Sequence, residues 1–273
     1  MPLGFVYMSE DNQPEKTDVE SAGEANESIS GAAPEAKLKR KMGRGIYLLP
    51  NLFTTASLFS GFYAIVAAMN GHFENAAIAI FVSMILDGLD GRVARMTNTQ
   101  SDFGAEYDSL VDMVAFGVAP ALVAFSFSLH TLGNFGWIAT FIYVAGAALR
   151  LARFNTQIGS VDKRFFVGLP SPAAAALVAG FVWNFHNFEV SNFLTMVTMI
   201  VVASAGVLMV SNVLYNSFKE FDLKRRVPFT AMLIMVLVFA VVAMEPSAVL
   251  FGGFFIYALS GPIYTLVLKK RSK

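Results

Sequence analysis

Cysteine is absent from this chain of 273 residues. That absence excludes disulfides, zinc–thiolate sites and thiol nucleophiles. Charge is also scarce, because Asp, Glu, Lys and Arg make up 15% of the residues, against about 25% in typical soluble domains. Hydrophobic residues make up 55%, so the sequence predicts an integral membrane protein whose apolar side chains face lipid.

The N-terminal part lacks the apolar residues that a folded segment needs. Residues 1–35 are rich in acidic and small polar side chains, and we expect a disordered tail there. Residues 36–47 then interleave basic side chains with apolar ones, which favours an amphipathic helix lying on anionic headgroups. A plain positive flank that orients the first membrane span is the alternative interpretation of the same residues.

Long apolar runs fill the rest of the chain. A helix needs roughly 20 mostly apolar residues to cross a bilayer, and about eight stretches approach that length. They lie near 48–69, 73–96, 104–129, 135–154, 171–187, 192–211, 228–244 and 247–268. The sequence therefore predicts an all-α polytopic domain over residues 48–268, followed by a short basic tail over residues 269–273.

The basic residues show which ends of these stretches share one side of the membrane. All 20 Lys and Arg residues precede the first stretch, lie near the end of an even-numbered stretch or after it, or end the chain. By the positive-inside rule, both termini and these connections are cytoplasmic in a bacterial-type inner or plasma membrane. The three histidines, His72, His130 and His186, fall on the opposite side, which disfavours a Ser-His-Asp hydrolase.

Carboxylates stand in the second and third stretches, where a charge costs at least a few kcal/mol. Asp87 and Asp90 are three residues apart, and Asp108 and Asp112 are four apart, so each pair shares one helical face. Two antiparallel helices would bring all four together, and their mutual repulsion requires protons or cations. Oxygen ligands favour hard divalent ions, and a pair of such ions supports displacement at phosphorus. The predicted active site therefore lies at the cytoplasmic end of this hairpin.

Other interpretations also fit carboxylates at membrane depth. Asp87 and Asp90 could form buried ion pairs with Arg92 or Arg95. A cation or proton transporter also places carboxylates in its spans, but transporter sites lie at the midplane between broken helices related by a repeat. The hairpin instead carries small residues that leave room for a polyanion near the backbone: Gly88, Gly91, Ala94 and Gly104.

The order of these residues resembles a known signature. From Asp87 to Asp112 the sequence reads D-x-x-D-G-x-x-A-R-x8-G-x3-D-x3-D, which is similar to the motif of the CDP-alcohol phosphatidyltransferases. The resemblance implies transfer of a phosphatidyl group from CDP-diacylglycerol to an alcohol, two Mg²⁺ or Mn²⁺ ions held by the four aspartates, and Asp112 as the base. It also implies a homodimer, with membrane lipids and not nucleic acid as partners. CDP-lipid binding would then fall to Asn51, Thr54, Gly91, Arg95 and Ser101.

The acceptor alcohol depends on a second resemblance. The segment from Arg150 to Ala175 is similar to the serine-accepting branch of the family, which implies L-serine as acceptor. The acceptor site would then comprise Arg150, Arg153, Asn155 and Ser171. A carboxylate on the acceptor needs a cation, but the arginines could equally be positive flanks, and Ser171 could simply end a helix. Glycerol phosphate and inositol phosphate are the alternative acceptors.

Overall fold

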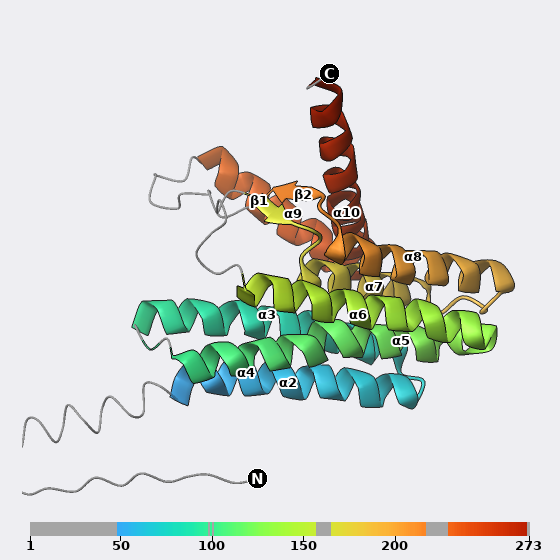
Figure 1. Ribbon diagram of the computed structural model, residues 1–273, viewed down its shortest axis with the longest axis horizontal. Coiled ribbons are helices and arrows are strands. Elements are labelled where there is room, and N and C mark those ends of the chain that lie inside the picture. The colour runs from blue at the N-terminus through green and yellow to red at the C-terminus, as the bar shows by residue number, and fades with distance from the viewer. Residues whose placement is uncertain (1–47, 98, 100, 157–164, 217–228, 272–273) are drawn as a thin grey trace, which may run out of the picture. The chain divides into compact units, whose positions relative to one another are not determined.

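Figure 1 shows a computed structural model of the protein, which describes residues 48–97, 99, 101–156, 165–216 and 229–271. The predicted acidic tail, 1–35, and the predicted amphipathic helix, 36–47, lie outside the described residues. The predicted basic tail, 269–273, is described only as far as Arg271. The described residues therefore belong almost entirely to the predicted membrane domain.

Helices form most of the described chain. In order they are α2 (Leu48–Met69), α3 (Phe73–Thr97), α4 (Asp102–Asp112), the π-helix η1 (Met113–Val118), α5 (Ala119–Phe127), the 3-10 helix η2 (Leu129–Leu132), α6 (Asn134–Thr156), α7 (Ser171–Phe185), α8 (Asn192–Val210), α9 (Phe229–Met244) and α10 (Pro246–Arg271). Each predicted apolar stretch coincides with a helix, or at 104–129 with the run from α4 to α5. Glycines with positive φ end two of these segments, Gly71 at 79° and Gly133 at 55°.

Five helical segments among the described residues are long and apolar enough to cross a membrane, judged by length and composition. They are Pro50–Met69, Asp102–Phe127, Asn134–Thr156, Asn192–Val210 and Pro246–Thr265. Helix α3 carries charged residues, and α7 and α9 have only 15 and 16 residues, fewer than the roughly 20 that a span needs. The count of eight spans therefore stays a prediction.

A pair of short strands interrupts the helical pattern. Strand β1 (Phe165–Val167) pairs antiparallel with β2 (Leu214–Asn216), with Phe166 opposite Tyr215. The sequence did not predict this pair, because three residues are too few to show the alternation of polar and apolar side chains that marks a strand. The pairing joins the segment before α7 to the segment after α8 (Figure 1).

Helix α7 lies in the core of the described helices. Every residue from Ala173 to Val182 is buried, and the helix packs against α3, α5, α8 and α10. Four of these buried residues are consecutive alanines, 173–176, whose small side chains let neighbouring helices approach closely. The short length of α7 is therefore compatible with a position surrounded by protein.

Buried hydroxyl groups join α2 to α3. The Ser57 and Ser83 hydroxyls are 2.7 Å apart, and the Ser83 hydroxyl donates to the Ser57 carbonyl at 3.0 Å. One turn further along α2, the Ser60 hydroxyl donates to the Ala79 carbonyl at 2.7 Å. Such bonds hold helices together where apolar surroundings provide no competing water. They fix the register between α2 and the helix that carries Asp87 and Asp90.

Helices α6 and α8 cross where two glycines meet. A Cβ atom added at Gly206 would lie 2.7 Å from the Tyr143 Cα atom, and one added at Gly146 would lie 2.4 Å from the Gly206 carbonyl oxygen. Backbone atoms cannot move away as a flexible side chain can, so these positions exclude any larger residue. The crossing holds α6 close to the rest of the bundle.

Gly206→Ala should therefore lower the temperature of the unfolding midpoint in detergent, because overpacking costs about 1–3 kcal/mol. The matched control is Gly252→Ala in α10, where a Cβ atom meets nothing within 4 Å and helix propensity favours alanine by about 1 kcal/mol. Thermal unfolding of both variants makes the comparison. Equal midpoints for the two variants would contradict the close crossing.

Candidate functional site

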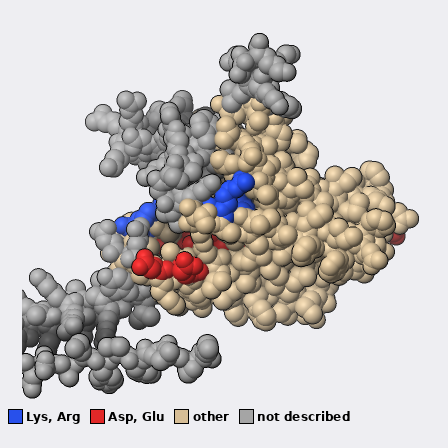
Figure 2. Space-filling view, viewed as in Figure 1, with Lys and Arg blue, Asp and Glu red and all other residues tan. Residues whose placement is uncertain are grey.

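Four aspartates face one another between α3 and α4. One carboxylate oxygen from each of Asp87, Asp90 and Asp108 lies within 4.8 Å of the others. The Asp112 carboxyl group completes the cluster as a direct neighbour of Asp87. The structure thus brings together the four residues that the spacing predicts. In Figure 2 most of the acidic and basic side chains on the visible face gather at one end of the described helices.

The donor set fits a hard divalent cation. Ions such as Mg²⁺ and Mn²⁺ bind oxygen at 2.0–2.6 Å, so oxygens on opposite sides of one ion are about 4–5 Å apart. One oxygen each of Asp108 and Asp112 is buried without a hydrogen-bond partner, which leaves both free for ligation. A buried carboxylate oxygen without a donor is costly unless a cation meets it.

Among the described residues, no arginine forms an ion pair with this cluster. Within the described ranges, the only ion pair joins His186 to Glu74. Arg95 is exposed, and its Nε–H donates to the Gly91 carbonyl at 2.9 Å. The alternative of a buried ion-pair network between Asp87 or Asp90 and Arg92 or Arg95 is therefore wrong for this structure.

Thr54 orients one of the aspartates. Its hydroxyl lies 2.8 Å from Asp90 Oδ2 and 3.1 Å from the Pro50 carbonyl, and only 5% of its surface is exposed. Asp90 is equally buried, at 5%. Because a hydroxyl carries one proton, donation to Asp90 fixes one carboxylate oxygen and leaves the other for a ligand. The bond also explains why Thr54 lies at the site although it belongs to another helix.

A cavity of about 490 Å³ opens beside the cluster. Its walls include Asp90 and Asp108 together with all the residues predicted to hold the CDP lipid, which are Asn51, Thr54, Gly91, Arg95 and Ser101. The volume lies within the roughly 300–1,000 Å³ of small-molecule sites. These residues come from α2, α3 and the start of α4. The described fold therefore brings residues that are far apart in the sequence to one cavity.

Two glycines and a helix cap shape the cavity wall. A Cβ atom added at Gly91 would meet nothing within 4 Å, so the backbone there is open to a ligand. At Gly104 a Cβ atom would lie 3.1 Å from Ser101 Oγ and 3.6 Å from Asn51 Oδ1. Ser101 is the N-cap of α4, and its hydroxyl accepts the Gly104 N–H at 3.0 Å. A larger residue at position 104 would crowd both polar side chains.

The cavity also has walls that the sequence did not assign. Pro50, Thr99, Asp102 and Ala105 line it as well, beside Ala94, which the sequence already placed among the small residues that leave room for a polyanion. Thr99 carries no sequence signal, because only the fold buries it to 8% exposure. Asp102 is exposed, as expected for a solvated turn residue, yet it borders the cavity. Asp102 and Ala105 precede Asp108 on the same helix, and this proximity could have indicated that they line the cavity.

Of the residues predicted to bind the acceptor, two meet beside the aspartates. The Arg150 guanidinium donates to the Ser171 hydroxyl at 2.5 Å, and Ser171 is fully buried at the first turn of α7. Arg150 also interacts with the charge of Asp112. Its Nε–H is buried without a partner. A cation with an unused donor therefore lies within electrostatic reach of Asp112, although the two side chains form no ion pair in the part of the chain that the structure describes.

The other two make contacts elsewhere. Arg153 donates to the Val210 carbonyl at 3.3 Å and to Asn212 Oδ1 at 3.4 Å, at the end of α8. The Asn155 amide donates to Ser109 Oγ at 3.0 Å and links α6 to α4. Both side chains thus hold helix ends together in this structure.

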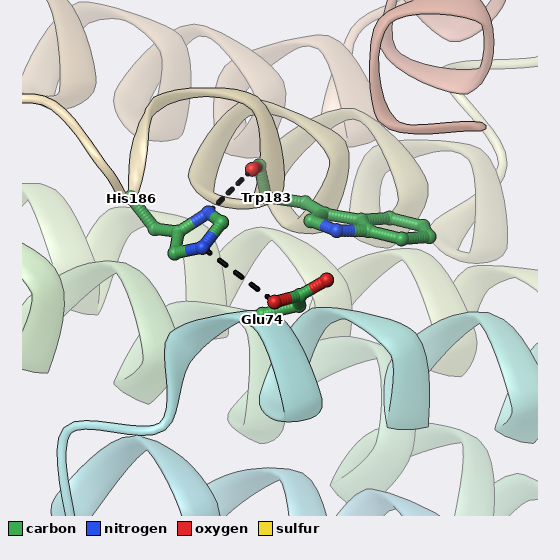
Figure 3. Close-up of polar contacts among 3 residues, drawn as sticks. All are labelled: Glu74, Trp183 and His186. Carbon is green, nitrogen blue, oxygen red and sulfur yellow. Dashed lines mark hydrogen bonds and ion pairs between the residues drawn. The ribbon is translucent and has the colours of Figure 1, made fainter. Parts of the chain in front are cut away.

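The histidine at the end of α7 lies far from the aspartates. Figure 3 shows His186 between the Trp183 carbonyl and Glu74, with its Nδ1 at 2.7 Å from the carbonyl and its Nε2 at 3.8 Å from Glu74 Oε2. Glu74 opens α3, and Asp87 stands 13 residues later on the same helix. At 1.5 Å per residue, roughly 20 Å separates the two positions. His186 therefore takes no part in the cluster.

Comparison with known proteins finds a match to a protein family. Residues 47–203 match the model of the CDP-alcohol phosphatidyltransferase family. A CDP-diacylglycerol–serine O-phosphatidyltransferase of Helicobacter pylori is 40% identical over 228 residues, covering 81% of this chain and 94% of the relative. The enzyme of the same name from Methanocaldococcus jannaschii is 35% identical over 175 residues, covering 64% of this chain and 77% of the relative.

Among solved structures, a phosphatidylinositol phosphate synthase of Mycobacterium tuberculosis with CDP-DAG bound aligns with a TM-score of 0.47 at 19% identity. The alignment covers 64% of this chain and 90% of that one.

Asp108→Asn should weaken Mn²⁺ binding at least tenfold, because it removes a charged oxygen from the cluster. Even mutation of residues that only support metal ligands lowers metal affinity about 10–100-fold. The matched control is Glu106→Gln on the same helix, whose side chain is exposed and outside the cluster. Titration of Mn²⁺ by electron paramagnetic resonance measures both. Unchanged affinity in Asp108→Asn would rule out this carboxylate as a ligand.

Proposed function

Because the chain belongs to the CDP-alcohol phosphatidyltransferase family, we propose that it is a CDP-diacylglycerol–serine O-phosphatidyltransferase. It transfers the phosphatidyl group of CDP-diacylglycerol to the hydroxyl of L-serine and releases CMP. The observation that carries this proposal is the cluster of Asp87, Asp90 and Asp108 within 4.8 Å of one another beside an open cavity. A transporter needs no such cavity for a nucleotide.

The cavity takes the CDP part of the donor lipid. Arg95 uses its Nε–H on Gly91, so its terminal nitrogens remain to donate to the pyrophosphate. The open backbone at Gly91 lets a phosphate approach closely. Asn51, Thr54 and Ser101 supply polar groups along the remaining wall. The acyl chains would enter from the cytoplasmic leaflet.

The four aspartates hold divalent metal, Mg²⁺ or Mn²⁺. When bound, two such ions neutralise the pyrophosphate and stabilise negative charge on the departing phosphate. Thr54 keeps Asp90 in one orientation, and partial burial of the aspartates limits the access of water to them. The protein thus supplies a rigid set of oxygens before substrate arrives.

Asp112 acts as the base. Its carboxylate takes the proton from the serine hydroxyl as that oxygen attacks the phosphatidyl phosphorus. A new phosphorus–oxygen bond to serine forms, the phosphorus–oxygen bond to CMP breaks, and CMP carries the negative charge away. Asp112 suits this role because it lies at the border between the metal cluster and Arg150.

Arg150 and Ser171 bind the acceptor. The unpaired Nε–H of Arg150 suits the carboxylate of serine, because charged hydrogen bonds to carboxylates are the strong ones. Ser171 holds the guanidinium in place. Arg153 and Asn155 have a supporting role, since their contacts tie α6 to α8 and α4.

The placement in the membrane follows the charge pattern. We propose that both termini and the aspartates face the cytoplasm, where the basic residues concentrate, and that eight helices span the membrane. A homodimer is proposed as the functional unit.

The deciding experiment offers CDP-diacylglycerol, Mg²⁺ or Mn²⁺ and one acceptor to the purified protein in detergent. CMP release is expected with labelled serine and not with glycerol 3-phosphate or inositol phosphate. Asp112→Asn should abolish release while CDP-diacylglycerol still binds. Release only with a phosphorylated acceptor would overturn serine, and release with none of them would overturn the transferase.

Arg150→Gln should raise the KM for serine by about tenfold or more, because a charged hydrogen bond contributes about 1.5–3 kcal/mol. The KM for CDP-diacylglycerol should change little, since Arg150 does not line the cavity. The matched control, Arg153→Gln, should lower thermal stability and leave the serine KM near its original value. Steady-state kinetics with both substrates decides, and equal effects of the two variants on serine KM would contradict this assignment.

A further inference from the structure

The helix that carries Asp108 and Asp112 changes its winding immediately after Asp112. Helix α4 ends at Asp112, and Met113–Val118 form the π-helix η1, in which the Ala119 N–H donates to the Val114 carbonyl. A π-turn holds one more residue than an α-turn, so it rotates everything that follows relative to what precedes it. The orientation of Asp112 therefore depends on how this wide turn is held.

Pro120 removes the α-helical partner of one backbone carbonyl in η1. In an α-helix the Phe116 carbonyl accepts the N–H of residue 120, but residue 120 is proline, which has no N–H and whose ring clashes with that carbonyl. Phe116 and Pro120 are both fully or almost fully buried. Away from water, a carbonyl without a donor is costly.

Tyr143 of α6 supplies a donor to this carbonyl. Its phenolic O–H donates to the Phe116 carbonyl oxygen at 3.0 Å, and its side chain has no exposed surface. Close packing makes the contact possible, because a Cβ atom at Gly117 would already lie 3.2 Å from Ala147 Cβ. Helix α6 therefore rests directly against the wide turn.

The same face of α6 also carries Arg150. Tyr143, Ala147 and Arg150 follow the spacing i, i+4, i+7, which lines one side of a helix. The same helix thus contacts the turn behind Asp112 through Tyr143 and carries Arg150, whose charge acts on Asp112. Movement of the turn against α6 would shift Asp112 relative to both Arg150 and the aspartates of α3.

We infer that Tyr143 is a positioning residue for Asp112: its hydroxyl replaces the N–H that Pro120 lacks and so fixes the wide turn that orients the Asp112 carboxylate. The inference rests on the proposed function only where kcat and KM are measured. Binding of Mn²⁺ by the aspartate cluster provides a second readout that needs no turnover.

The test removes the hydroxyl and then restores the backbone donor. Tyr143→Phe should lower kcat about tenfold to a hundredfold, the range that misplacement by about 1 Å produces, and should weaken Mn²⁺ binding, with little change in the KM for serine. Adding Pro120→Ala to this variant provides an N–H for the Phe116 carbonyl and should recover most of both losses. Tyr63→Phe on α2, whose side chain is 45% exposed, is the control and should match the unmodified protein.

A Tyr143→Phe protein with unchanged kcat and Mn²⁺ affinity, or with a lower unfolding temperature alone, would overturn the inference, as would a double variant that recovers nothing. If Tyr143→Phe does not fold, Pro120→Ala is compared with the double variant. Equal values of kcat and of Mn²⁺ affinity in these two variants support the inference. A clear difference between them contradicts it. If the unmodified protein releases no CMP, the proposed function fails, and the Mn²⁺ titrations still decide on Tyr143.

Discussion

Mutual repulsion among four carboxylates is the interaction on which the rest of the site depends. Asp87, Asp90, Asp108 and Asp112 lie close together, with Asp90 buried and the other three half-buried, and like charges repel more strongly there than in solution. Within the described part of the chain no basic side chain pairs with them. We propose that divalent cations relieve this repulsion, because an arrangement of carboxylates that is unfavourable without cations favours metal binding.

Holding such a cluster requires a stiff frame, and the described helices provide one. Buried serine hydroxyls lock α2 to α3, and Thr54 extends this contact to Asp90. Alanine-rich α7 fills the core and presents Ser171 to Arg150. The contacts between α2 and α3 involve only backbone atoms and short side chains, so little rotamer freedom remains to loosen them.

Much of this arrangement could be predicted from the sequence. Charges are so costly in apolar helices that Asp87 to Asp112 had to share a site, and the signature resemblance indicated the cavity residues that the fold then gathers. Contacts between distant segments could not be predicted. Arg150 and Arg153 lie on nearby positions of one helix, and only the placement of α7 and α8 directs one to Ser171 and the other to the end of α8. The β1–β2 pair and the wide turn after Asp112 were missed for the same reason, since tertiary packing selects them.

The most direct test of this account is an anomalous-difference map from crystals of the protein grown with Mn²⁺. The account predicts two peaks between α3 and α4, each within about 2.0–2.3 Å of carboxylate oxygens from the four aspartates. Peaks elsewhere, or aspartates that stay free of metal at saturating Mn²⁺, would contradict it.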